Sequence, residues 1–302
     1  MEDIVHRWEW RAFGARFPTA EHAFDELSPL GEPQITEETY LLGNDAVNVK
    51  IRFDLLDVKT LLEVDGNGLE LWDPKLKTEF PIAASDVAAV HDVWGRATPR
   101  MDRDTYTMRQ FLEELIAPDP DLSIAEVRKE RVRYSVEGCM AELTSISVGD
   151  RSTRTVAVEY EDPEAVWAVV QKLGLAGYVN ASYGHGLNCL LGKSPVRYGV
   201  IDIGTNSVKF HIGEEHPDRS WTRVVDRAAV TRLGEGLDET GEIQPEPLER
   251  TIRAVVEMVE EARSSGALAV AAVGTAALRL AANSQLAIDS IRERSGAEVQ
   301  VV

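Results

Sequence analysis

The chain has 302 residues, of which 44% are hydrophobic and 27% charged, and its formal net charge at pH 7 is −19. This charge argues against general binding to nucleic acids or anionic membranes, because both are negatively charged. No apolar run approaches the roughly 18 residues of a membrane-spanning helix. Cys139 and Cys189 lack metal-ligand spacing and fit reduced core thiols, so we expect a cytoplasmic protein.

Up to about residue 192, short segments alternate charged and apolar side chains with the period of two that is typical of β-strands. Two arrangements fit this pattern. Charges line the solvent face of an ordinary antiparallel sheet, or they turn inward in a closed antiparallel barrel. Trp8 and Trp10 favour the barrel, because burial of these indoles would turn Glu9 toward a polar interior. Helices are predicted over residues 106–116 and 163–173.

Gly192 and Pro195 indicate a linker over residues 193–196, and the pattern changes after it. An apolar strand ends at Asp202, a small polar turn follows, and an alternating strand leads away. From residue 197 onward the predicted order is three strands, a helix, a strand, a helix and a final strand. This order predicts a mixed sheet with helices packed against it.

The small polar turn has the composition of an anion-binding loop, because consecutive backbone N–H groups and hydroxyls can donate to phosphate oxygens. It consists of Gly204, Thr205, Asn206 and Ser207. Asp202 can hold a divalent cation that bridges to phosphate. A second strand leads to Thr275, which can cap a helix, and to Arg279, whose guanidinium suits phosphate oxygens. The alternatives are an ordinary hairpin turn and a solvated arginine.

Three motifs occur in register in this region: Asp-Ile-Gly-Thr-Asn-Ser at 202–207, Arg-Leu-Gly-Glu-Gly-Leu at 232–237, and Gly-Thr-Ala-Ala-Leu-Arg-x-Ala-x-Asn at 274–283. Their order and spacing resemble the exopolyphosphatase / guanosine pentaphosphate phosphohydrolase family of the actin-like ATPase superfamily. The resemblance implies an actin-like (ribonuclease H-like) α/β lobe over residues 197–302. It also implies Mg²⁺- or Mn²⁺-dependent release of terminal phosphate from polyphosphate or a phosphorylated guanosine nucleotide.

By this resemblance Asp202 serves the metal, residues 204–207 form the first phosphate loop, and Thr275 and Arg279 contact the substrate. Family members continue after a strand like 298–302 into a segment with the glutamate that positions the attacking water, and then into a second lobe. We find neither here and expect no catalytic residue within this chain. The expectation is therefore that the 302 residues are the front part of a longer enzyme and have negligible exopolyphosphatase activity alone.

The first 192 residues show a second resemblance, to the CYTH family of triphosphate tunnel proteins. It rests on the frame Arg7-x-Glu9-x-Arg11, the basic strands 49–52 and 131–134, and the acidic strand 158–161. It implies a CYTH-like antiparallel barrel over residues 1–192 that holds a triphosphate and a metal. The implied triphosphate-binding residues are Arg11, Lys50, Arg52, Lys59, Arg131 and Arg133, and the implied metal ligands are Glu9, Glu159 and Glu161. The family has Glu-x-Glu-x-Lys in its first strand, so Arg7 replaces a glutamate, which argues against metal binding there.

Several functions fit these observations. The first is a phosphohydrolase that acts on polyphosphate or a related phosphate anhydride, and a CYTH-type triphosphatase is a variant of it. The second is a module that binds polyphosphate or an alarmone for regulation without cleaving it. The third is a relative of ATP-using sugar kinases, which share the phosphate loop. The expected partner is a phosphate chain or phosphorylated nucleotide, with no nucleic acid or membrane, and a homodimer is left open.

Overall fold

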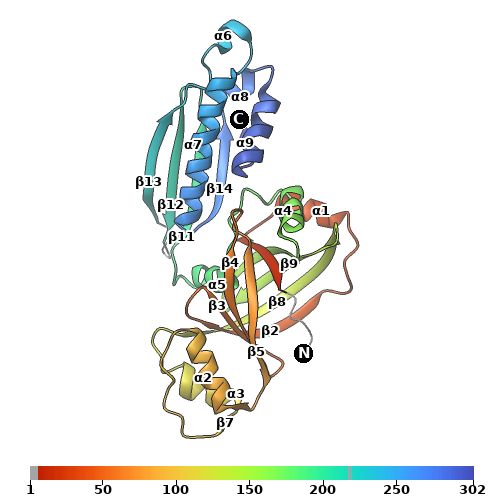
Figure 1. The fold of residues 1–302 in the computed structure, drawn as a ribbon, viewed down its shortest axis with the longest axis vertical. Helices are drawn as coiled ribbons and strands as arrows, with labels where there is room; N and C mark the ends of the chain where they lie inside the picture. Colours follow the sequence, from red (N-terminus) through yellow and green to blue (C-terminus); the bar gives the residue numbers. More distant parts are fainter. Residues whose placement is uncertain (1–5, 217, 219) are drawn as a thin grey trace. The chain divides into compact units, whose positions relative to one another are not determined.

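The structure is a computed structural model and describes residues 6–216, 218 and 220–302. The chain forms two compact units, which Figure 1 draws in sequence colours. The first unit runs to Val170 and resumes over Asn180–Ser194. The second comprises Gln171–Val179 and Pro195–Val302. Among the described helices, none is both long and apolar enough to cross a lipid bilayer.

The short segment Gln171–Val179 belongs to the second unit because it hydrogen-bonds to strand β14 (Ala267–Gly274). The amide of Val179 donates to the Leu268 carbonyl at 3.1 Å, and the Gly177 carbonyl accepts from Val270 at 2.9 Å. The chain thus enters the second unit, returns to the first, and enters the second again. The sequence-based division at residues 192 and 197 lacks this first entry.

The first unit is a closed barrel of antiparallel strands in the order β1-β10-β9-β8-β2-β3-β4-β5 (Figure 1). This confirms the predicted antiparallel barrel. Its strands are β1 (Arg7–Gly14), β2 (Gln34–Leu42), β3 (Val47–Arg52), β4 (Leu55–Val64), β5 (Glu70–Glu79), β8 (Ser123–Val136), β9 (Cys139–Val148) and β10 (Arg151–Tyr160). Its other elements are α1 (Pro18–Asp25), β6 (Ile82–Ala83), α2 (Ala84–Val93), β7 (Thr105–Tyr106), α3 (Met108–Gln110), the π-helical η1 (Phe111–Ile116), α4 (Pro163–Lys172) and α5 (Tyr183–Leu190).

The apolar side of β3 and β4 faces outward, where α2 and η1 cover it. Val49 and Val58 lie in one buried cluster with Val87 of α2 and Phe111 of η1. Successive side chains of a strand point to opposite faces. The polar residues that alternate with the buried apolar ones, such as Asn48 and Lys50 of β3, therefore point into the barrel. Trp10 of β1 is only 1% exposed, as expected if Glu9 faces inward. The barrel is therefore apolar outside, under its helices, and polar inside.

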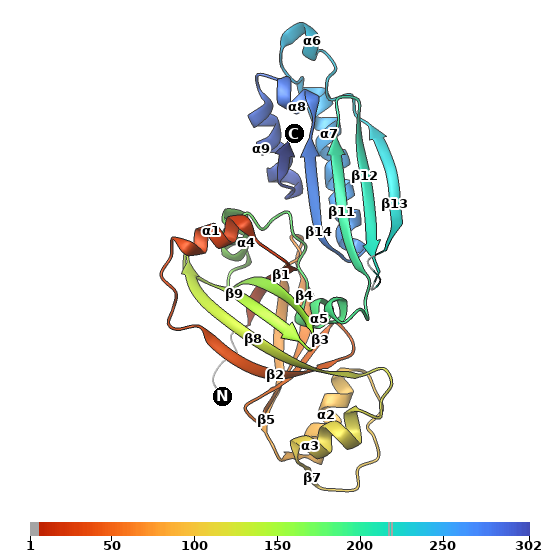
Figure 2. The same cartoon turned by 180° about the vertical axis from the view of Figure 1, so that it is seen from behind.

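The second unit is a five-stranded mixed sheet in the order β13-β12-β11-β14-β15 (Figure 2). Its strands are β11 (Val196–Ile203), β12 (Ser207–Glu215), β13 (Trp221–Val230), β14 (Ala267–Gly274) and β15 (Val299–Val301), and its helices are α6 (Leu237–Thr240), α7 (Pro245–Ser264), α8 (Ala276–Leu280) and α9 (Ser284–Ser295). Strands β11 to β13 form an antiparallel meander, and β11, β14 and β15 run parallel. The predicted strand and helix order is confirmed.

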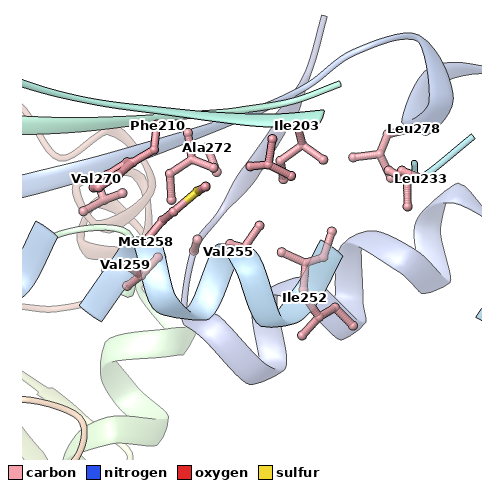
Figure 3. Close-up of a cluster of buried hydrophobic side chains, with 14 of the residues drawn as sticks. Ile203, Phe210, Leu233, Ile252, Val255, Met258, Val259, Val270, Ala272 and Leu278 are labelled. Atoms are coloured by element: carbon pink, nitrogen blue, oxygen red, sulfur yellow. The ribbon is translucent and has the colours of Figure 1, made fainter. Parts of the chain in front are cut away.

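One face of this sheet is covered by helices. Figure 3 shows Met258 of α7 directed toward Phe210 and Ala272 of the sheet, and Val255 and Ile252 of the same helix belong to the same buried cluster. Side chains of α8 and α9 belong to the same buried cluster. Together with Val259, these α7 residues recur three or four positions apart, which gives the helix the apolar stripe that such packing requires.

Helix α5 packs closely against the inside of the barrel, and we predict that this contact tolerates no added methyl group. A Cβ on Gly186 would lie 2.3 Å from the Phe13 ring, whereas one on Gly184 meets only ordinary contacts of 3.7 Å or more. Gly186→Ala should therefore lower the free energy of unfolding by about 1–3 kcal/mol. Gly184→Ala in the same helix should be neutral or slightly stabilising, because alanine favours helix. Denaturant unfolding of both variants is the measurement, and equal stabilities would contradict the close packing.

Candidate functional site

Glu142 is the centre of a buried ion-pair network inside the barrel. Its side chain on β9 lies 3.0 Å from Nη1 of Arg11 and 3.1 Å from Nε of Arg131. Arg11 comes from β1, which is not a neighbour of β9, so this pair spans the interior. Burial alone would raise the pKa of Glu142, but the two guanidinium groups lower it. The glutamate is therefore an anion, and both arginines are held by it.

A second network surrounds Glu38 of β2, which is 1% exposed. The ammonium of Lys129 donates to Glu38 at 2.9 Å and to the hydroxyl of Tyr40 at 2.6 Å. Arg131 and Arg52 each lie 3.7 Å from the same carboxylate. Burial opposes ionisation of Glu38, but Lys129, Lys50 and Arg131 together outweigh it and lower the pKa of Glu38 to about 2. Burial also lowers the pKa of Lys129 to about 7, although Glu38 limits that fall.

Tyr183, the first residue of α5, covers these charges with its ring. Lys129 Nζ lies 3.8 Å from the ring centroid and the Arg11 guanidinium carbon 4.3 Å from it, which are cation–π contacts. The ring also stacks on Tyr40 with a centroid distance of 5.2 Å. Ser182 holds the helix start in place, because its hydroxyl accepts from the His185 amide at 3.2 Å. Helix α5 therefore supplies a buried aromatic lid to both networks.

Three carboxylates lie side by side on the inner face of β5, β1 and β10. Glu9 is directly opposite Glu70 on one neighbouring strand and Glu159 on the other. Burial raises the pKa of Glu70 to about 7, and the charge of Glu9 adds to this effect. Burial and Glu9 likewise raise the pKa of Glu159. Arg11 Nε donates to Glu9 at 2.8 Å, and Arg7 Nη1 donates to Glu159 at 3.3 Å.

The proposed metal ligands of the barrel do not converge. Glu161 lies beyond the end of β10 and is exposed, whereas Glu9 and Glu159 face each other inside. Within the described ranges, no group of three His, Cys, Asp or Glu side chains is arranged to hold a metal ion. The Arg7 guanidinium lies 3.3 Å from the Glu159 carboxylate, and it cannot bind a metal because it has donors only. The residues present therefore do not fit a metal in the barrel.

The predicted basic residues lie in the barrel strands, but they differ in their partners. Arg11, Arg52 and Arg131 contact Glu142 or Glu38, and Lys50 lies 3.6 Å from Asp57. Lys59 forms no ion pair within the part of the chain that the structure describes, and neither does Arg133. Several buried polar atoms of the barrel interior have no hydrogen-bond partner among the described residues. They are Asn48 Oδ1, Arg131 Nε, Arg133 Nε, Thr144 Oγ1 and Tyr183 OH.

Sequence reasoning missed five residues of this interior, namely Glu38, Glu70, Lys129, Glu142 and Tyr183. Lys129 and Glu142 carry a usable signal, because each is in register with an inward residue that was identified: Glu142 pairs with Arg133, and Lys129 precedes Arg131 by two. Glu38 carries no such signal, because its strand β2 has polar residues on both faces. Tyr183 carries no periodic signal, because it arrives on a helix from outside the barrel.

The predicted phosphate loop of the second unit lies at the end of β11, where β14 also ends. These strands are parallel, so their carboxyl ends meet at one edge of the sheet, as Ile203 and Gly274 show by their pairing. The Thr275 hydroxyl donates to the Ile203 carbonyl at 3.3 Å. The turn is closed by the Gly204 amide, which donates to the Ser207 carbonyl at 3.0 Å. The structure thus brings residues 204–207 and Thr275 together.

The segment around the second motif braces this loop from outside. The amides of Thr231 and Arg232 donate to the Asn206 carbonyl, and the Gly234 amide donates to the Thr205 carbonyl at 2.9 Å. A Cβ on Gly234 would lie 2.3 Å from Thr205 Cγ2, so the loop requires glycine there. The conformation of residues 204–207 is therefore set by the second motif.

Asp202 and Arg279 differ in how well they suit their predicted roles. Asp202 Oδ1 is buried and has no hydrogen-bond partner in the described ranges, and its Oδ2 lies 3.9 Å from Lys209. One free carboxylate fits Mg²⁺, which is commonly bound by one or two carboxylates together with substrate phosphates and water. Arg279 is turned to the Val302 carbonyl, to which Nη1 donates at 2.6 Å. Thr275 makes no capping hydrogen bond to α8, contrary to expectation, because its hydroxyl contacts Ile203.

Residues 210–302 match the Ppx/GppA phosphatase family. Exopolyphosphatase 1 of Mycobacterium tuberculosis is 31% identical over 107 residues, which cover 35% of this chain and 31% of that protein. The chain thus spans about a third of the length of the curated relatives it matches. A solved Ppx/GppA family member from Aquifex aeolicus is similar with 29% identity and a TM-score of 0.35, over 36% of this chain and 35% of its own.

A further solved structure resembles the region of the barrel. It is a Hippeastrum protein described as an adenylyl cyclase with a dominant triphosphatase activity. The identity is 15% and the TM-score 0.38, over 62% of this chain and 96% of that one.

Glu70 makes the stability of the barrel depend on pH. Its pKa is about 7 in the folded chain, above the ordinary value of 4.5. Between these values the unfolded chain has released a proton that the folded chain keeps, so stability falls as the pH rises. We predict that Glu70→Gln, which keeps an acceptor for Trp72 Nε1, is more stable than the wild type by on the order of 2 kcal/mol at pH 8, with a smaller gain near pH 5.

Chemical denaturation at both pH values measures this difference. Glu63→Gln, at an exposed position of β4, is the matched control and should change neither value. If the free energies of unfolding of the wild type and of Glu70→Gln changed in parallel between the two pH values, the raised pKa of Glu70 would be contradicted.

Proposed function

We propose that the chain belongs to a hydrolase of phosphate anhydrides that releases terminal phosphate from inorganic polyphosphate, with guanosine pentaphosphate as the other candidate substrate. The observation that carries this proposal is the match of residues 210–302 to the Ppx/GppA phosphatase family, together with the convergence of the predicted loop residues at one sheet edge. The 31% identity to an exopolyphosphatase over 107 residues supports the same reaction class.

In this proposal, residues 204–207 and Thr275 bind phosphate oxygens. The backbone turn supplies N–H donors, and the hydroxyls of Thr205 and Ser207 supply further ones. Asp202 would hold Mg²⁺ or Mn²⁺ through its unpartnered oxygen, and such a cation would supply neutralisation of charge on the phosphates. Arg279 contacts substrate after exchanging its bond to Val302 for one to phosphate. Positioning and charge stabilisation supply most of the catalysis in phosphoryl transfer, so these residues account for one wall of the site.

A second function is proposed for the barrel, namely binding of a chain of linked phosphates without cleaving it. The observation that favours it is the set of unpartnered groups inside the barrel. Lys59 and Arg133 form no ion pairs in the described ranges, and the fully buried Thr144 hydroxyl has no hydrogen-bond partner there. Buried polar groups are normally paired, so such a set suits a polyanionic ligand. Binding without cleavage is proposed because no metal-ligand set is formed there.

The hydrolase proposal is tested by removing one charge. In the full-length protein, Asp202→Asn should slow Mg²⁺-dependent phosphate release from polyphosphate at least about tenfold, which corresponds to ~1.4 kcal/mol in the barrier. The substitution keeps the side-chain shape and removes the negative charge that holds the cation. Asp226→Asn on strand β13, where Asp226 pairs with Arg223 and His211, is the control and should leave the rate unchanged. Equal phosphate release by the wild type and Asp202→Asn would refute this site.

A further inference from the structure

Inside the barrel, the row of Glu70, Glu9 and Glu159 would normally require a cation. Carboxylates directly opposite one another on neighbouring strands repel, and the repulsion is stronger away from water. A divalent metal ion is one way to stabilise such a row. The structure shows that the chain does so with its own groups.

Each of the three carboxylates already has a compensating group. Glu9 accepts from Arg11 Nε at 2.8 Å, and Glu159 accepts from Arg7 Nη1 at 3.3 Å. Glu70 accepts from Trp72 Nε1 at 3.1 Å. The row therefore needs no further positive charge.

The Arg7 guanidinium is the group that decides this arrangement. Its Nη1 lies 3.3 Å from Glu159 Oε1, and it cannot act as a metal ligand because it has no acceptor atom. The remaining predicted ligand, Glu161, lies outside the barrel strand. The Arg7 side chain thus takes the place of an exchangeable metal ion.

The groups left to bind a ligand are donors and cations. Lys59 and Arg133 form no salt bridge in the described part of the chain, although the charge of Lys59 limits the rise in the pKa of Glu159. The hydroxyls of Thr144, which is 0% exposed, and Tyr183, which is 6% exposed, lack hydrogen-bond partners there. Phosphate oxygens are acceptors, and arginine can bind two of them at once. These groups complement a bare phosphate chain rather than a chain wrapped around a metal.

We propose that the barrel binds a linear chain of linked phosphates as the free anion, without a divalent cation, with the Arg7–Glu159 pair in the place of the metal. This inference rests on the proposed phosphate binding by the barrel and specifies its ionic form. It has a consequence for divalent cations: Mg²⁺ coordinates the same phosphate oxygens, so it competes with the barrel for the ligand. In this protein, the need for a metal is confined to Asp202.

Calorimetric titration of the whole chain with tripolyphosphate tests the proposal, in EDTA and in excess MgCl₂. We expect binding in EDTA, and weaker binding in MgCl₂. Lys59→Ala should weaken the binding in EDTA at least about tenfold, which assigns the signal to the barrel, and Lys77→Ala at an exposed position of β5 should leave it unchanged. Binding that appears only in MgCl₂ and is weakened by Lys59→Ala would overturn the metal-free form while leaving phosphate binding by the barrel intact, and binding only in MgCl₂ that Lys59→Ala does not change would overturn both. No binding under either condition would overturn both.

The role of Arg7 is tested by two variants of this half-exposed residue. Arg7→Glu adds a fourth carboxylate beside Glu159 and removes its pairing cation, so binding in EDTA should fall about tenfold and MgCl₂ should now strengthen it. Arg7→Gln removes the charge without adding a ligand, so binding should weaken without any gain from MgCl₂. Thermal unfolding verifies that both variants are folded. If MgCl₂ strengthens binding by the wild type as much as by Arg7→Glu, the assignment of Arg7 is refuted.

Discussion

Two buried glutamates hold the interior of the barrel together. Glu38 and Glu142 are the anions around which Arg11, Lys129 and Arg131 are arranged, at distances of 2.9 to 3.7 Å. An unpaired buried charge costs several kcal/mol, so removal of either glutamate would leave cations in a region that cannot stabilise them. Arg131 contacts both carboxylates and makes one network of the two. The ion pairs of the interior are thus required for the stability of the fold, independently of any ligand.

This constraint explains why the barrel is apolar on the outside. A barrel of this size cannot be stabilised by an interior filled with ion pairs, because such pairs gain little after their desolvation. Its hydrophobic burial must come from the other face of the strands. Helices α2 and η1 provide part of it against β3 and β4, and the resulting cluster includes Ile51 and Leu56, both 3% exposed or less. The helices are therefore needed for stability and leave the interior available for charge.

Much of the fold could be predicted from local patterns, and part of it could not. Alternation at Arg7, Glu9 and Arg11 identified a strand with a charged inner face, and the buried Trp10 supports that interpretation. Strand β2 was not predicted, because its first half is polar on both sides and only its second half is buried. The position of Tyr183 depends on how α5 returns to the barrel, which no local pattern encodes. For the same reason, the entry of residues 171–179 into the second unit could not be anticipated.

The same distinction applies to charge. The net charge of −19 describes the surface at long range, where it repels a polyanion. Screening limits that repulsion to about 8 Å at physiological salt. Inside the barrel, the arginines and lysines lie within 4 Å of their partners, so their field is local and little screened. An acidic protein can therefore bind phosphate chains provided that its cations are buried and held in place, and Glu38 and Glu142 hold them. The repulsion outside then slows the approach of the ligand, and added salt counteracts it by screening the surface more than the interior.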